Sequence, residues 1–146
     1  IRDRCENVFD VSKNFLDNKK LKSDYDFLLV DFHGEITSEK MAIGHFFDGK
    51  ATLVVGTHTH VPTNDCRILV NGTAYQTDAG MCGDYNSVIG MNKEISLNRF
   101  FKEKDAVKHF PSNGVGTLSG VIVEADISTG LAKKVYRLIE GGNLLN

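Results

Sequence analysis

The fold is decided by one stretch of the sequence, Ala51-Thr52-Leu53-Val54-Val55-Gly56-Thr57-His58-Thr59-His60. Its apolar half predicts a buried β-strand, and its polar half places two imidazoles one residue apart where that strand ends. A second run, Phe27-Leu28-Leu29-Val30-Asp31-Phe32-His33, has the same form and ends in another histidine. Because open α/β sheets usually build their sites at strand ends, the two runs together indicate a metal site.

The segment between the two runs predicts a helix. Thr37 or Ser38 can cap its beginning, and Asp48-Gly49 supplies a stop signal at its end. A strand, a helix and a second strand normally make two parallel strands with a right-handed crossover. The near-continuous apolar character of 27–33 further predicts that this strand is buried on both faces.

Outside this unit the sequence predicts two further helices and two antiparallel hairpins. They are helices over 7–22 and 93–103, and hairpins that pair 67–70 with 73–77 and 118–125 with 131–139. Asn71-Gly72, in the first hairpin, is the strongest short hairpin signal. Parallel strands followed by antiparallel hairpins predict an α/β fold with a mixed sheet or two packed sheets.

The composition is that of one soluble globular domain. The net charge of -2 and the isoelectric point near 6.2 give no basic field, so nucleic acid and anionic membranes are not indicated as partners. No apolar run approaches the roughly 20 residues that span a bilayer. Three separated cysteines suit a reducing compartment, and we expect a cytoplasmic protein. The chain lacks an initiator Met, so we expect it to begin partway through a longer protein.

The histidines at the strand ends have the chemistry of metal ligands. In an extended chain His58 and His60 face one region of space, and their separation suits one metal or two adjacent metals. Neutral imidazole binds zinc, iron or manganese at about 2.0–2.2 Å. His33 joins His58 and His60 if the strand over 27–33 lies next to the strand over 51–55. Asp31 and Glu35, two residues to either side of His33, could each orient an imidazole by accepting its other N–H.

The remaining polar candidates have plainer interpretations. Asp78 is either a further metal ligand or, as its place at the end of the first hairpin favours, a turn-stabilising carboxylate. His45 and His109 lack ligand-like spacing and are interpreted as ordinary surface or core residues. Cys82 is interpreted as an inert, buried thiol rather than a nucleophile.

Three longer motifs follow one another along the chain: Val30-Asp31-Phe32-His33-Gly34-Glu35-Ile36-Thr37-Ser38-Glu39-Lys40, Val54-Val55-Gly56-Thr57-His58-Thr59-His60-Val61 and Thr73-Ala74-Tyr75-Gln76-Thr77-Asp78-Ala79-Gly80-Met81. The first resembles the D-F-H-A-E-x-T-S-E-K signature of the YmdB-like metallophosphoesterases, and the other two resemble later motifs of that family. The resemblance covers about residues 24–140. It departs from the family pattern at Gly34, at Pro62 and in the loop Cys82-Gly83-Asp84.

The resemblance implies a calcineurin-like α/β/β/α sandwich, of which residues 1–146 are a single, partial domain, the C-terminal half. It implies a centre of two divalent metal ions, Fe, Mn or Zn, that hydrolyses 2′,3′-cyclic nucleotides or related phosphodiesters. By position, His33 and His58 would bind one metal and His60 the other.

The family's earlier motifs are absent from this sequence. They are a G-D motif, a Glu-Asn pair and a G-N-H motif, which in the family supply the remaining ligands and the proton donor. We therefore expect no proton-donating catalytic residue in this chain, and little turnover from it alone.

Two other functions stay open at this point. The first is a catalytically silent fold that serves as a binding or assembly module and holds no transition metal. The second is a single structural zinc site. A half-fold would also expose sheet surface, so pairing with another chain as a homo-oligomer is a further hypothesis.

Overall fold

The predicted strand–helix–strand unit forms as β1 (Leu29–His33), α2 (Thr37–Phe46) and β2 (Leu53–Thr57) in a computed structural model that describes residues 6–102 and 108–145. β1 and β2 are parallel, and His33 lies opposite Thr57. On its other side β2 pairs in parallel with β4 (Ala74–Gln76), which pairs antiparallel with β3 (Arg67–Ile68). The strand order β1-β2-β4-β3 makes this a mixed sheet, as the sequence predicts.

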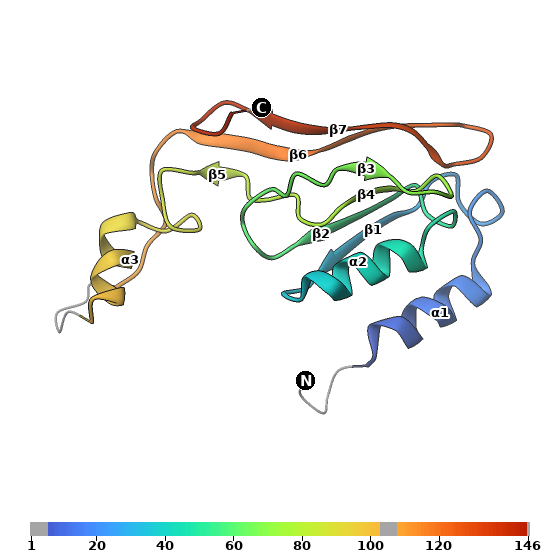
Figure 1. The fold of residues 1–146 in the computed structure, drawn as a ribbon, viewed down its shortest axis with the longest axis horizontal. Helices are drawn as coiled ribbons and strands as arrows, with labels where there is room; N and C mark the ends of the chain where they lie inside the picture. The colour runs from blue at the N-terminus through green and yellow to red at the C-terminus, as the bar shows by residue number, and fades with distance from the viewer. Residues whose placement is uncertain (1–5, 103–107, 146) are drawn as a thin grey trace.

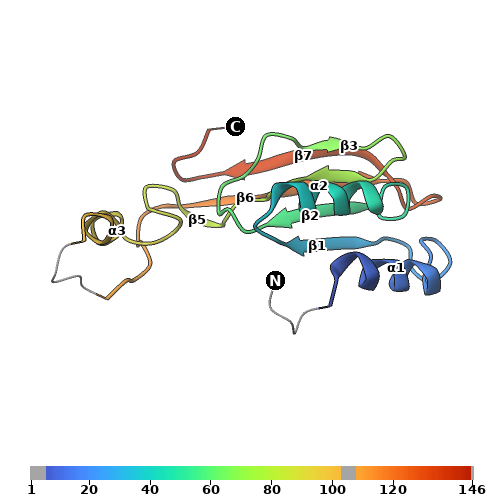
Figure 2. The ribbon, with the colours of Figure 1, turned by 60° about the horizontal axis from the view of Figure 1, so that its bottom comes forward.

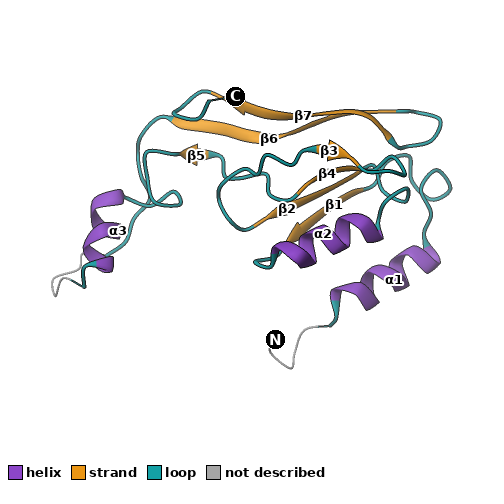
Figure 3. Cartoon of the chain, in the orientation of Figure 1, coloured by secondary structure: helices purple, strands orange, loops and turns teal. Residues whose placement is uncertain are grey.

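A second, antiparallel sheet is formed by β5 (Gly83–Asp84), β6 (Gly116–Ala125) and β7 (Ala132–Glu140). The β6–β7 hairpin runs along the first sheet on the side opposite α1 (Val8–Asn18) and α2 (Figures 1 and 3). β7 contacts β3 and β4, which joins the two sheets. The structure thus confirms an α/β fold with a mixed sheet and antiparallel hairpins.

The core lies between α2 and the four-stranded sheet. Its buried members are Ile43, Phe47, Ala51, Val54, Leu69 and Tyr75. Gly44 lets α2 approach the sheet closely, because a Cβ at this position would lie 2.4 Å from Cε2 of Tyr75. The core therefore fixes α2 directly over β2 and β4.

Two helix ends differ from the sequence prediction. α1 ends at Asn18 rather than at residue 22, because Lys19 is extended and Leu21 forms a bridge with Tyr25. The predicted caps of α2 are wrong, since Thr37 is already its first residue and the N-cap is Ile36, which makes no side-chain capping bond.

The prediction that β1 is buried on both faces is also wrong. Its residues alternate between exposed and half-buried, and the Leu29 side chain is 62% exposed. The apolar run of 27–33 predicts a covering layer on each face of the strand. Within the described part of the chain β1 instead lies at the edge of its sheet and pairs with β2 alone.

The third helix, α3 (Lys93–Phe100), lies at one end of the molecule beyond β5 (Figure 2). The end of the predicted helix, residue 103, lies outside the described residues. The apolar side of α3 faces solvent, with Phe100 80% and Phe101 76% exposed. Among the helices of residues 6–102 and 108–145, none is long and apolar enough to cross a membrane.

Candidate metal centre

The parallel pairing of β1 and β2 brings two of the predicted histidines together. His33 is the last residue of β1, and His58 follows the last residue of β2. Nε2 of His33 lies 3.2 Å from Nδ1 of His58, and the ring centroids are 5.1 Å apart. Both side chains are exposed, so the two imidazoles can be reached from solvent.

The spacing of these two nitrogens fits a shared metal ion. Two bonds of about 2.0–2.1 Å at a tetrahedral metal place their nitrogens about 3.3 Å apart. The 3.2 Å between His33 Nε2 and His58 Nδ1 is close to that value. The separation of the two nitrogens is therefore compatible with one shared divalent ion.

A hydrogen-bond chain orients the His33 ring. Nδ1 of His33 lies 3.1 Å from Oγ1 of Thr57, which donates to Oδ1 of Asp31 at 3.4 Å. Because the hydroxyl gives its one hydrogen to Asp31, we assign the proton of the His33–Thr57 bond to Nδ1. Nε2 of His33 is then left with its lone pair toward His58.

The sequence predicts a direct contact between Asp31 and His33. In the structure Asp31 instead reaches His33 through Thr57. Glu35 makes no hydrogen bond to an imidazole of the described residues. Thr57 is a functional candidate that the sequence analysis missed. Its place opposite His33 is set by the register between β1 and β2, which the sequence analysis did not derive.

His60 has its own orienting contact. Its Nδ1 lies 2.9 Å from the carbonyl oxygen of Ile89, which can only accept, so Nδ1 carries the proton and Nε2 is free for a metal. Among residues 6–102 and 108–145 there is no group of three or more His, Cys, Asp and Glu side chains that could hold one ion. The structure therefore pairs His33 with His58 and does not bring His60 into the same group.

The loop that carries these histidines has an unusual backbone. His58 has φ 147° and His60 has φ 65°, both in the region that favours glycine. Such residues cost of order 1–3 kcal/mol each and persist only where surrounding contacts hold them. Strain of this kind is typical of functional loops.

Asp78 is one of the contacts that hold this loop. Its Oδ2 accepts from the Thr59 N–H at 2.9 Å and from Nζ of Lys40 at 2.9 Å, and its Oδ1 accepts from the Gly80 N–H at 3.0 Å. Burial raises the pKa of Asp78, but these hydrogen bonds outweigh it and hold the pKa below its usual value. Asp78 is fully buried, so it stabilises the turn and does not face the histidines as a ligand.

Neither of the other two histidines takes part in this centre. His45 lies exposed in the last turn of α2, and His109 Nε2 lies 2.9 Å from Oγ of Ser96. Cys82 is exposed, so the expectation of a buried thiol is wrong, and its Sγ donates to the Ser119 carbonyl oxygen at 3.4 Å.

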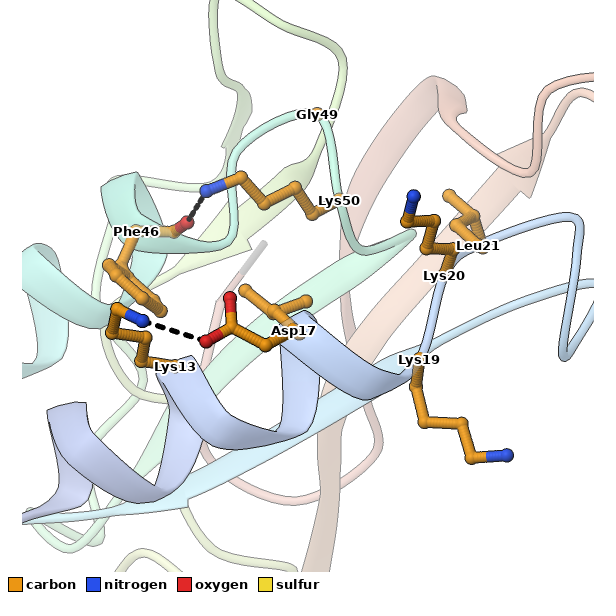
Figure 4. Close-up of a pocket in the computed structure, with 9 residues that line it drawn as sticks. Lys13, Asp17, Lys19, Lys20, Leu21, Phe46, Gly49 and Lys50 are labelled. Atoms are coloured by element: carbon orange, nitrogen blue, oxygen red, sulfur yellow. Dashed lines mark hydrogen bonds and ion pairs between the residues drawn. The ribbon is translucent and has the colours of Figure 1, made fainter.

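A separate cavity of about 550 Å³ lies between α1 and the loop after α2 (Figure 4). It is lined by Lys13, Leu16, Asp17, Lys19, Lys20, Leu21, Phe46, Gly49 and Lys50. Lys13 is paired with Asp17 at 2.7 Å, and Lys50 donates to the Phe46 carbonyl oxygen. No histidine lines this cavity, so it is distinct from the candidate metal centre.

The sequence of this chain is similar to those of known proteins. Residues 1–138 match the family described as YmdB-like protein. The chain is 48% identical over 113 residues to the 2′,3′-cyclic-nucleotide 2′-phosphodiesterase of Bacillus subtilis, covering 77% of this chain and 42% of that protein.

Two crystal structures share the fold. A hypothetical protein from Thermus thermophilus superposes with a TM-score of 0.83 at 35% identity, covering 97% of this chain and 53% of that one. A novel phosphatase from Mycoplasma pneumoniae superposes with a TM-score of 0.80 at 42% identity, covering 92% and 47%. The chain thus spans about half the length of the proteins it matches.

Proposed function

Because the chain belongs to the YmdB-like protein family, we propose that it forms part of a metal-dependent phosphodiesterase acting on 2′,3′-cyclic nucleotides or related phosphodiesters. The observation that carries the proposal is the 3.2 Å separation of His33 Nε2 and His58 Nδ1 at the ends of two parallel strands. The name of the Bacillus subtilis relative supports the substrate class.

In the proposed centre each histidine has one task. His33 and His58 bind one divalent ion, and His60 binds a second through Nε2. Thr57 and Asp31 hold the His33 ring in place, and the Ile89 carbonyl does the same for His60. These contacts fix the protonated nitrogen of His33 and of His60, so both rings are ready to bind without a change of tautomer.

The metal ions, Fe, Mn or Zn, would neutralise the charge of the phosphodiester and activate water as the nucleophile. The chain's own contribution is to hold imidazole donors at the sheet edge in reach of solvent. Further ligands and a proton donor are expected from the part of the relatives' length that this chain does not span.

The proposal is tested with the full-length protein that its gene encodes. Hydrolysis of 2′,3′-cyclic AMP and of bis-p-nitrophenyl phosphate is measured with Mn²⁺ and after removal of metal with a chelator. We expect hydrolysis to need metal, and His58→Ala to lower kcat/KM at least about 100-fold, since the ion would lose one of its ligands.

His45→Ala is the matched control, because His45 is an exposed histidine of α2 without a contact to the site. It should leave kcat/KM unchanged. Unchanged hydrolysis by His58→Ala would refute the assignment of this site. A full-length protein that neither binds metal nor hydrolyses phosphodiesters would favour the silent binding module.

A further inference from the structure

A buried ion pair lies next to the histidine loop. Nζ of Lys40 and Oδ2 of Asp78 are 2.9 Å apart, and their side chains are only 1% and 0% exposed. In every other ion pair of the described residues, at least one side chain is more than a third exposed. The Lys40–Asp78 pair therefore requires a reason for its burial.

Stability is a poor reason for such a pair. Taking two charges out of water is costly, and replacing a buried ion pair by apolar residues of similar size is often neutral or stabilising. A buried pair of this kind is better explained by what it holds in place.

What this pair holds is the peptide between the two histidines of the loop. The carboxylate of Asp78 accepts the N–H of Thr59, whose neighbours on either side are His58 and His60. Both neighbours have positive φ, so this backbone does not adopt its conformation without help. The second oxygen of Asp78 binds the Gly80 N–H, which fixes the carboxylate itself.

Gly56 leaves room for the Lys40 side chain on its way to Asp78. Lys40 extends from α2 past Gly56 of β2 to Asp78, which follows the end of β4. A Cβ on Gly56 would lie 2.7 Å from Cδ of Lys40 and 1.9 Å from the carbonyl oxygen of Thr77. The bare backbone of β2 thus leaves the path that the lysine stem occupies.

We infer that the Lys40–Asp78 pair is a positioning device for the metal centre, which acts through the Thr59 N–H to direct His58 toward His33 and His60 toward Ile89. The inference rests on the proposed function for its metal. It makes neither residue a ligand, since both are buried and the carboxylate oxygens are already bonded.

The test removes both charges at once, so that no unpaired charge stays buried. In the full-length protein, K40M/D78L is compared with the wild type by Mn²⁺ titration calorimetry. We expect Mn²⁺ affinity to fall about 10–100-fold, the usual effect of removing a group that orients metal ligands. The matched control is K134M/E124L, which removes an exposed pair on the β6–β7 hairpin and should leave affinity unchanged.

A folding defect is separated from a positioning defect by two further measurements. Thermal unfolding without metal shows whether K40M/D78L is folded at the titration temperature. If it is not, D78N takes its place, because its single acceptor oxygen cannot replace both Oδ2, which accepts the Thr59 N–H, and Oδ1, which accepts the Gly80 N–H. A folded variant that binds Mn²⁺ with wild-type affinity would overturn the inference.

A metal-free measurement separates this inference from the proposed function. Long-range ¹H–¹⁵N NMR of the histidine rings should show His60 as the single Nδ1–H tautomer in the wild type and as a tautomer mixture in K40M/D78L. An unchanged tautomer in the variant would overturn the positioning role. A tautomer change in K40M/D78L, together with a wild type that binds no Mn²⁺, would overturn the proposed function and leave the positioning role standing.

Discussion

Replacing Thr57 by Val removes one hydroxyl and tests how the His33 ring is held. The two side chains have nearly the same shape, so the change deletes the 3.1 Å contact to His33 Nδ1 and the 3.4 Å contact to Asp31 with little repacking. The His33 ring then loses its fixed tautomer and orientation, and part of its readiness to bind metal.

The size of the effect follows from the contacts that are lost. A neutral hydrogen bond contributes about 0.5–1.5 kcal/mol net. Because His33 and Asp31 are exposed, water can replace part of the lost bonding. We therefore expect about 1.4 kcal/mol, a tenfold loss of Mn²⁺ affinity, at the lower end of the 10–100-fold range for groups that orient ligands.

The assay is Mn²⁺ titration calorimetry on the full-length protein, with kcat/KM for a phosphodiester measured in parallel. Thr37→Val is the control, because Thr37 is an exposed threonine of α2 that contacts no histidine. Asp31→Asn keeps an acceptor oxygen for the Thr57 hydroxyl and should show a smaller loss than Thr57→Val. If Thr57→Val binds Mn²⁺ within twofold of the wild type, the Asp31–Thr57–His33 chain does not prepare the ligand and the reasoning fails.

Three other outcomes are expected. Gly44→Ala should destabilise the fold by about 1–3 kcal/mol in urea unfolding, because its Cβ would lie 2.4 Å from the Tyr75 ring. A variant as stable as the wild type would mean that α2 can move outward. Burial raises the pKa of Asp65, but hydrogen bonds from Thr63, Thr77 and Arg67 outweigh it and lower the pKa to about 2. The carboxylate should thus contribute about 1–2 kcal/mol of stability above pH 4 that is lost as the pH falls through 2, and Asp65→Asn should flatten this part of the stability–pH curve. Mn²⁺ at 100 times its Kd should stabilise the full-length protein by about 2.7 kcal/mol, measured as a rise in Tm that a chelator reverses. An unchanged Tm after metal removal would contradict this expectation.

The sequence predicts the elements that periodicity and turn chemistry control. The strand–helix–strand unit and both hairpins form where the apolar runs and Asn71-Gly72 place them. His33 and His58 meet because parallel strands in register deliver their last residues to one edge. That juxtaposition follows from the pattern alone.

Other features depend on contacts that no local pattern encodes. The exposure of β1 could not be predicted, because an apolar run does not show whether another layer covers each face of the strand. The role of Thr57 depends on the register between two strands 24 residues apart. Lys40 lies on the helical stripe of Ile43 and Phe47, but its burial depends on Asp78, 38 residues further along the chain.

The central claim is that His33 and His58 bind one metal ion. Its most direct test is the anomalous scattering of full-length crystals grown with Mn²⁺ and measured at the manganese edge. We predict a peak about 2.0–2.2 Å from both His33 Nε2 and His58 Nδ1, with a second peak at His60 Nε2. Well-ordered histidines with no peak between His33 and His58, in crystals that bind manganese elsewhere, would contradict the account.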